Sequence, residues 1–327
     1  MLVSLLKTFF VLIVGTLSGY LFKNLSNKYK FINPESLKTL AVFLQKLGMI
    51  WLMSITYIGS LWIFKIDSII EIISLPFVGV ISILIGGGFA LLLAKYFHYN
   101  RLDTGSLFSC GFFANTVSLG GMICFFYLGE EGYAFVPIFT FFMRLFYYGI
   151  GFPVSKMHSN DFNQEESIAK KLVEILKDPF FYIGIGSVIL GLLLNISPLV
   201  RPKIYATINE IVIPMTTFVL LFSVGLNLKL SRVNNYIKEC LYISLIKFIA
   251  VPLITLILVL LFNYQSIDNG LPLKVSLIMS SMPVAFNSVI TANIYNLNVD
   301  MVNSCWIFTN FGIILVLPFL LLFINIF

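Results

Sequence analysis

Ten long apolar segments divide the chain, and each is close to the roughly 20 residues that a helix needs to cross the hydrocarbon core of a bilayer. Of the 327 residues, 59% are hydrophobic and only 11% are charged, which is far more apolar than a soluble domain of this length. We therefore expect an all-α polytopic membrane protein. The approximate limits of the segments are 4–22, 39–64, 70–94, 105–128, 132–155, 179–197, 205–228, 236–262, 274–295 and 300–325.

The lysine and arginine residues between these segments predict the orientation. One side collects thirteen of them: Lys23, Lys28, Lys30, Lys38, Lys95, Arg101, Lys156, Lys170, Lys171, Lys177, Lys229, Arg232 and Lys238. The other side has five: Lys7, Lys65, Arg201, Lys203 and Lys274. By the positive-inside rule the richer side is cytoplasmic. We therefore expect a multi-pass protein of the cell (plasma) membrane, with both termini extracytoplasmic. This distribution also explains the net charge of +6, so we expect no nucleic-acid partner.

Five segments precede the polar central loop and five follow it. Because an odd number of spans reverses the side on which the second half starts, the halves should have opposite topology. We assign residues 1–156 to a first five-helix repeat, 157–178 to a cytoplasmic connector and 179–327 to a second, inverted repeat. A short likeness between residues 138–142 and 307–311 agrees with this division.

The fourth and ninth segments are interrupted at their centres by polar residues and helix breakers. The fourth carries Asn115 and Thr116 ahead of two glycines, and the ninth carries Pro283 followed by Asn287 and Ser288. Residues 287–289, Asn-Ser-Val, also echo the Asn-Thr-Val of residues 115–117. Two broken membrane segments in corresponding places of two halves point to a transporter binding site. We therefore expect broken helices 4 and 9 to cross each other.

Such a crossing predicts a site for a small organic anion. Two half-helix N-termini would carry partial positive charge to one place, and asparagine amides and hydroxyl groups can donate hydrogen bonds to a carboxylate. The candidate substrate-binding residues are Asn115, Thr116, Pro283, Asn287 and Ser288. In the alternative interpretation these side chains only bond helices to one another, as Asn, Ser and Thr do in many membrane bundles.

Three cations inside the segments are candidate charge partners for the anion, because ionisable groups at membrane depth are costly. Arg144 lies near the middle of the fifth segment, where it could neutralise substrate or line a water-filled cavity as a structural cation. Lys46 lies about seven residues, and Lys247 about eleven residues, inside a segment from its cytoplasmic end. Snorkelling of both lysines to the membrane surface is the favoured interpretation.

No metal site or other cofactor is expected. The four cysteines all fall inside apolar segments without the paired spacing of a metal site, and both histidines lie in expected loops without acidic neighbours. A membrane-embedded lipid-modifying enzyme would need paired acidic motifs or a buried histidine, so that class is an alternative without a matching motif. We therefore expect a protein that is not an enzyme.

Two stretches of the sequence resemble the auxin efflux carrier family of PIN-like membrane transport proteins, in its bacterial type. One is Asn115 to Gly120, and the stronger is Ser281 to Pro283 with Tyr295 to Asp300 and the final Leu317-Pro318. The resemblance implies ten helices in two inverted five-helix repeats, crossing helices 4 and 9, an elevator-like movement, a homodimer and transport of carboxylates. It makes Asn115 the substrate-site asparagine and Pro283 the second crossover proline.

The sequence departs from that family at the first interruption, where Val117 and Met122 replace the glycine and proline that relatives commonly carry. A sodium-coupled carrier of the bile-acid-symporter type is similar in design, but it should place acidic residues beside the crossover. A membrane sensor is a further alternative and would need a separate output partner. The sequence thus favours a secondary transporter that exports small organic anions by alternating access.

Overall fold

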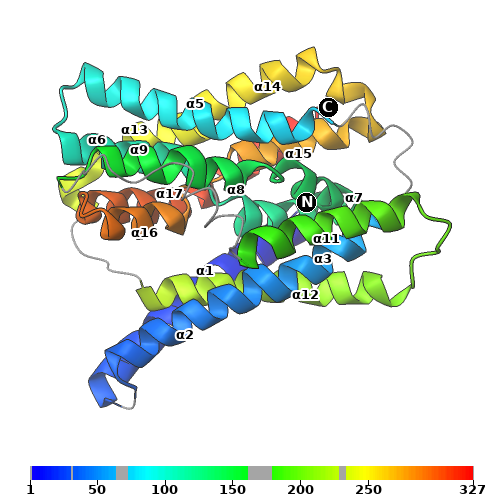
Figure 1. Ribbon diagram of the computed structural model, residues 1–327, viewed down its shortest axis with the longest axis horizontal. Helices are drawn as coiled ribbons and strands as arrows, with labels where there is room; N and C mark the ends of the chain where they lie inside the picture. Colours follow the sequence, from blue (N-terminus) through cyan, green and yellow to red (C-terminus); the bar gives the residue numbers. More distant parts are fainter. Residues whose placement is uncertain (1, 31, 64–72, 161–178, 228–232, 327) are drawn as a thin grey trace. The chain divides into compact units, whose positions relative to one another are not determined.

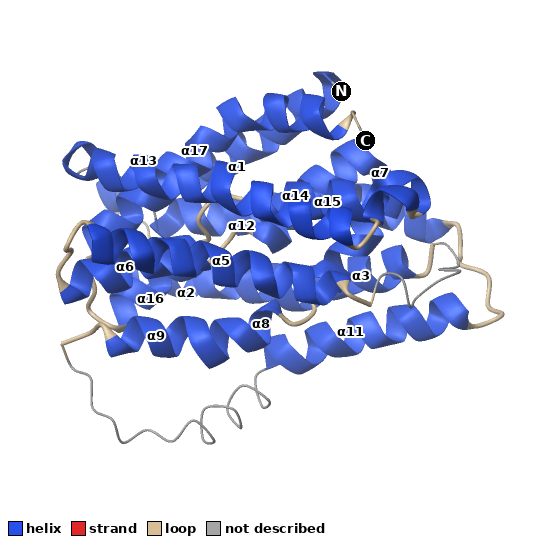
Figure 2. Cartoon of the chain, turned by 90° about the horizontal axis from the view of Figure 1, so that it is seen from above, coloured by secondary structure: helices blue, strands red, loops and turns tan. Residues whose placement is uncertain are grey.

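The computed structural model describes residues 2–30, 32–63, 73–160, 179–227 and 233–326, and these residues form helices joined by loops (Figure 2). Seven helices in this part of the chain are long and apolar enough to cross a membrane, which makes the chain a multi-pass membrane protein. They are Val3–Tyr29, Glu35–Leu61, Leu75–Tyr96, Thr116–Met157, Ile204–Asn227, Val233–Leu261 and Val299–Ile324. Most of the predicted connector, residues 161–178, lies outside the described residues.

The chain folds into two compact units, and each unit draws segments from both halves of the sequence. Unit 1 comprises Met1–Ile69, Gly121–Pro137 and Asp178–Lys229. Unit 2 comprises Ile70–Gly120, Ile138–Lys177 and Leu230–Phe327. The compact units are therefore not the predicted repeats, which remain a prediction about topology.

Unit 1 is built around helices that approach each other closely at glycines. A Cβ atom on Gly19 would lie 2.1 Å from the Phe222 carbonyl oxygen, and one on Gly225 would lie 2.3 Å from the Thr16 carbonyl oxygen. Small residues at such positions let the backbones of two membrane helices pack together. The described helices of unit 1 are α1 (Leu2–Tyr29), α2 (Pro34–Lys46), η1 (Leu47–Leu52), α3 (Met53–Leu61), most of α7 (Gly121–Phe139), α11 (Pro179–Ile196) and α12 (Ile204–Asn227). Of these, α2, η1 and α3 form one continuous helical segment (Figure 1).

In unit 2, helices α5 and α6 are in close contact where the glycine triplet of α5 meets Gly111. A Cβ atom on Gly86 would lie 2.3 Å from the Gly111 carbonyl oxygen, whereas one on Gly88 would have no neighbour within 4 Å. Helix α14 also packs along α5 (Figure 1). The helices of unit 2 are α5 (Leu75–Tyr96), α6 (Arg101–Phe112), η2 (Thr116–Gly120), α8 (Met143–Phe146), η3 (Tyr147–Gly151), α9 (Phe152–Met157), η4 (Val233–Tyr236), α13 (Ile237–Leu245), η5 (Ile246–Ala250), α14 (Val251–Leu261), η6 (Tyr264–Ser266), η7 (Asp268–Gly270), α15 (Leu271–Ser280), α16 (Phe286–Ile294) and α17 (Val299–Ile324).

Hydrogen bonds between polar side chains tie the start of α6 to the start of α17. The Asn298 side chain caps α17 by accepting from the Met301 N–H, and its Nδ2 donates to Asp103 Oδ1 at 2.6 Å. Nearby, Tyr99 donates to Glu239 Oε1 at 2.7 Å, and burial together with this bond raises the pKa of Tyr99. Tyr99 therefore stays a protonated donor. The bonds of Asn298 hold the start of α17 against α6, the helix that leads to the first interruption described below.

Candidate functional site

Two interrupted segments of unit 2 pair with each other at the centre of the candidate site. Helix α6 ends at Phe112 and α15 ends at Ser280, and the extended residues that follow form an isolated antiparallel bridge between Ala114 and Val284. The Asn115 N–H donates to the Pro283 carbonyl at 2.8 Å, and the Ala285 N–H donates to the Phe113 carbonyl at 3.2 Å. The bridge thus supplies partners for backbone groups that leave the helical pattern, as membrane depth requires.

The remaining backbone groups of the two bridge residues are bonded to side chains from neighbouring helices. Tyr147 Oη lies 3.4 Å from the Ala114 nitrogen and 3.2 Å from the Ala114 carbonyl oxygen, with geometry for both bonds. The Val284 N–H donates to Thr309 Oγ1 at 3.2 Å, and Asn310 Nδ2 donates to the Val284 carbonyl at 2.9 Å. The backbone N–H and carbonyl groups of both bridge residues are therefore hydrogen-bonded.

Asn310 also joins the bridge to a predicted site residue. Asn115 Nδ2 donates to Asn310 Oδ1 at 3.4 Å, and Asn115 Oδ1 accepts from Ser118 Oγ at 2.5 Å. Sequence reasoning missed Asn310 and Tyr147 as parts of the site. The available signal was an asparagine inside the last apolar span, within a stretch that was noted only for its likeness to residues 138–142.

Among the predicted substrate-binding residues, Asn115 and Asn287 present half-buried side chains. Asn287 lies in the first turn of α16, and its amide has no hydrogen bond to another residue of the described part of the chain. A half-buried amide with two donors and an acceptor can bind a carboxylate. These two asparagines are therefore the groups best placed to contact a ligand.

The other three predicted residues are buried and bonded within the protein. Ser288 Oγ donates to the Ala285 carbonyl at 2.6 Å, and Thr116 Oγ1 donates to Met143 Sδ at 3.7 Å. Pro283 contributes its carbonyl to the bridge. In this conformation their polar groups build the interruption, and their role toward a ligand stays a prediction.

The predicted echo between residues 115–117 and 287–289 does not match the pairing of the two segments. Asn115 directly follows its bridge residue Ala114, whereas Asn287 lies three residues after Val284. The bridge places Ala285 in the position equivalent to Asn115. The reason is that pairing in an extended segment follows backbone hydrogen bonds, which do not depend on the similarity of side chains.

The three candidate charge partners differ in their surroundings. Lys46 is exposed in the last turn of α2 in unit 1. Arg144 is half-buried on α8 in unit 2. Lys247 is only 2% exposed, so the snorkelling expected of it is wrong. Its place on η5 turns the side chain toward the interior of unit 2, a direction that hydropathy does not reveal.

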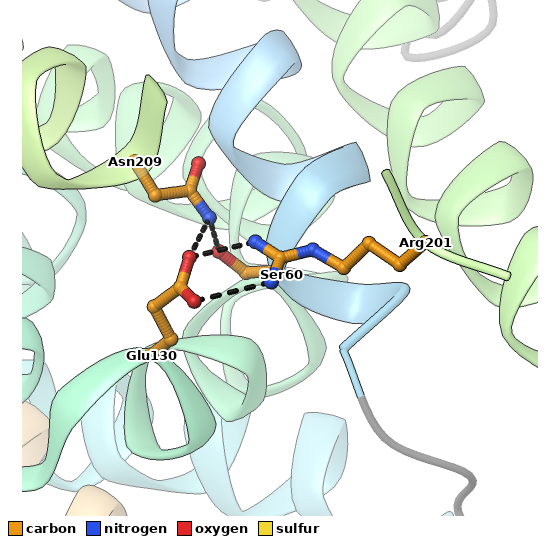
Figure 3. Close-up of polar contacts among 4 residues, drawn as sticks. All are labelled: Ser60, Glu130, Arg201 and Asn209. Atoms are coloured by element: carbon orange, nitrogen blue, oxygen red, sulfur yellow. Dashed lines mark hydrogen bonds and ion pairs between the residues drawn. The ribbon is translucent and has the colours of Figure 1, made fainter. Parts of the chain in front are cut away.

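Unit 1 holds a separate polar cluster of Ser60, Glu130, Arg201 and Asn209 (Figure 3). The expected segments had placed Glu130 and Arg201 in loops. Glu130 Oε1 accepts from Arg201 Nη2 and from Asn209 Nδ2, both at 2.7 Å, and Glu130 Oε2 accepts from Arg201 Nη1 at 3.2 Å. Asn209 Nδ2 also donates to Ser60 Oγ at 2.8 Å. Gly129, with φ +71°, is a non-helical kink that divides α7 into two helical parts, and Glu130 begins the second of them.

No group of histidine, cysteine or acidic side chains within the described ranges is arranged to hold a metal ion. The four cysteines are free and buried, in agreement with their interpretation as small buried side chains.

The chain is similar to a protein of Methanocaldococcus jannaschii that is named only as an uncharacterized transporter. The two are 27% identical over 261 residues, which is 76% of this chain and 79% of the relative. No model of a known protein family matches the chain. The apolar helices and this similarity define a multi-pass membrane protein related to a transporter.

Proposed function

We propose that this protein is a secondary membrane transporter that exports small organic anions such as carboxylates. The observation that carries the proposal is the pairing of two interrupted segments in unit 2, with the half-buried amides of Asn115 and Asn287 beside it. The similarity to a protein named as a transporter points to the same class. The substrate class and the direction of transport come from the sequence argument and the family resemblance.

The helix pattern supports ten transmembrane helices. The candidate span Thr116–Met157 has 42 residues, about twice the length that a bilayer needs, and the non-helical Gly129 divides it. Helix α11, with 18 residues, supplies a further span, and α15 with α16 forms another that is interrupted in its middle. Together with α6, which leads into the first interruption, these segments support the proposal of ten spans.

The composition of the compact units supports the inverted repeat. Expected spans 1 and 2 lie in unit 1 together with spans 6 and 7. Spans 6 and 7 are the first and second spans of the second repeat, so they are the equivalents of spans 1 and 2. Spans 3 and 8, and the two interruptions themselves, lie in unit 2. One exception is the stretch Gly121–Pro137, which clusters with unit 1. Equivalent spans of two repeats are expected to take equivalent places, and most of the spans follow this rule.

The anion preference is supported by the donors around the bridge. The first N–H groups of a helix have no partner within that helix and favour negative charge, and α16 begins at Phe286 directly after the bridge. The Asn287 amide lies in this same turn. A carboxylate bound there would receive backbone and side-chain donors together. In the elevator-like movement implied by the family resemblance, unit 2 would carry this site, and the resemblance also implies a homodimer.

The test is ligand-dependent thermal stabilisation of the purified full chain with a panel of mono- and dicarboxylates and indole acids. Wild type is compared with Asn115→Ala and Asn287→Ala, and Asn293→Ala is the matched control. Asn293 lies on the same helix as Asn287, is exposed, and bonds only to the Val289 carbonyl. A ligand at 100 times its dissociation constant should contribute about 2.7 kcal/mol to stability.

We expect one carboxylate class to stabilise wild type and Asn293→Ala, and to lose its effect in the two site variants. Equal stabilisation of all four proteins would move the site away from the interruptions. A panel without any effect on wild type would contradict an organic-anion carrier. Flux of the stabilising compound from proteoliposomes then tests the direction of transport.

A further inference from the structure

Lys247 is a buried cation without an acidic partner in the described part of the chain. Its side chain is 2% exposed, and no salt bridge joins it to a described carboxylate. Burying an ammonium group costs several kcal/mol in free energy unless charge or hydrogen bonds compensate for it. An uncompensated cation of this kind inside a membrane protein is a candidate functional group.

The position of Lys247 relates it to the first interruption. Val251, the residue that follows η5, lies beside Gly86 of α5, and Gly86 in turn contacts the carbonyl of Gly111, one residue before α6 ends at Phe112. Phe248, which is next to Lys247 in the sequence, lies beside Gly312 on α17, the helix that also carries Asn310. Lys247 therefore lies beside helices that carry residues of the candidate site.

The local backbone is also unusual at this position. Lys247 belongs to the π-helical turn η5, Ile246–Ala250, and the proline at position 252 opens the next helix. Proline lacks the N–H group that would continue the helical bonding pattern, and π turns inside helices occur frequently at functional sites. The wider turn changes the direction of the side chains on this helix relative to a regular α-helix.

Neighbouring charged groups do not neutralise the ammonium. Helix α5 carries Lys95 and α13 carries Lys238, and both are exposed at the ends of their helices. Glu239, the carboxylate of α13, accepts the hydrogen bond from Tyr99. A bound anion would supply a counter-charge for the ammonium.

We propose that the Lys247 ammonium binds the carboxylate of the transported anion and supplies the positive charge that the asparagines lack. This inference rests on the proposed function and identifies the residue that selects for charge. Asn115 and Asn287 would recognise the shape and hydrogen-bonding pattern of the substrate. Lys247 would discriminate a carboxylate from its neutral amide.

The experiment compares each stabilising carboxylate of the panel with its neutral amide on wild type, Lys247→Met, Lys247→Arg and Lys238→Met. Chloride is tested as a second anion, and sodium concentration is held constant. Methionine keeps most of the volume of lysine without its charge, and arginine keeps the charge. Lys238→Met removes an exposed lysine from the adjacent helix, so it controls for the loss of one positive charge.

We expect Lys247→Met to bind the carboxylate about tenfold to a hundredfold more weakly, as for loss of a charged hydrogen bond, and to bind the amide as wild type does. Lys247→Arg should restore part of the preference, and Lys238→Met should behave as wild type. Loss of the chloride effect alone would assign Lys247 to an inorganic anion and overturn the proposal. An unchanged carboxylate preference in Lys247→Met would overturn it as well.

These outcomes are separate from those of the proposed function. If the carboxylate still depends on Asn115 and Asn287 but not on Lys247, the transporter proposal stands and the charge-selecting role of Lys247 is wrong. If Lys247→Met does not fold, Lys247→Arg decides, because a guanidinium in the same place must keep the preference for the carboxylate over the amide. Loss of that preference in a folded Lys247→Arg would then count against the proposal.

Discussion

Replacing Glu130 with glutamine should destabilise unit 1 substantially. In the structure this carboxylate accepts three hydrogen bonds, two from Arg201 and one from Asn209. Glutamine keeps the shape of the side chain but removes its charge and offers one acceptor oxygen in place of two. If that oxygen keeps the two bonds at Oε1, the new NH₂ group faces Arg201 Nη1 across the 3.2 Å of the former bond, donor against donor.

The magnitude follows from burial and charge. Breaking a fully buried ion pair by removing one partner costs about 3–5 kcal/mol. The side chains of Arg201 and Glu130 are 13% and 18% exposed, so water screens the remaining charge in part. Arg201 Nε has no hydrogen-bond partner even in the intact cluster, which leaves little room to compensate. We expect Glu130→Gln to lower the free energy of unfolding by about 2–3 kcal/mol.

The assay is denaturant-induced unfolding of the purified chain in detergent, in a double-mutant cycle with Arg201→Met. Residues in one such network should show a coupling energy of about 1–2 kcal/mol. Glu210→Gln is the control, because Glu210 is an exposed acid next to Asn209 on the same helix and should change stability by less than about 0.5 kcal/mol. Equal effects of Glu130→Gln and Glu210→Gln, or a coupling energy near zero, would refute the reasoning.

Two further changes test the packing of unit 2, both by the same unfolding measurement. Asn310→Leu leaves the Val284 carbonyl without its 2.9 Å donor, and it should lower the free energy of unfolding by about 2–3 kcal/mol; a loss below about 0.5 kcal/mol would mean that water or a shift of the chain replaces the amide. Gly86→Ala places a methyl group 2.3 Å from the Gly111 carbonyl oxygen and should cost about 1–3 kcal/mol, whereas Gly88→Ala, with open space, should be neutral or stabilising. Equal effects at the two glycines would contradict the close contact of α5 and α6.

The two interruptions could be located from the sequence because their signals are local. Asparagine, glycine pairs and proline inside an apolar span disrupt a helix wherever the rest of the chain lies. Their partners could not be found in this way. Tyr147 and Asn310 act on residues 33 and 26 positions away, and a tyrosine or asparagine in an apolar span has many other uses. Contacts of that range depend on how whole helices pack.

Lys247 and Glu130 show the same limit for charged residues. Hydropathy gives the depth of a residue along a helix, but the side on which it faces depends on rotation about the helix axis. Lys247 was expected at the membrane surface and is buried, because the π turn η5 and the neighbouring helices set that rotation. Glu130 was expected in a loop, but it begins the second helical part of α7, after the kink at Gly129, and belongs to the polar cluster of unit 1.

The bonding of the bridge also refines the physical picture of recognition in unit 2. The N–H and carbonyl groups of Ala114 and Val284 are already bonded to Tyr147, Thr309 and Asn310, so a ligand is not needed to satisfy them. The crossing can therefore keep its shape when empty, and a bound anion would gain little from these backbone groups. In the proposed site, affinity would then come from the first turn of α16, from the asparagine amides and from the ammonium of Lys247. For this reason, side-chain substitutions should change substrate preference without destroying the crossing.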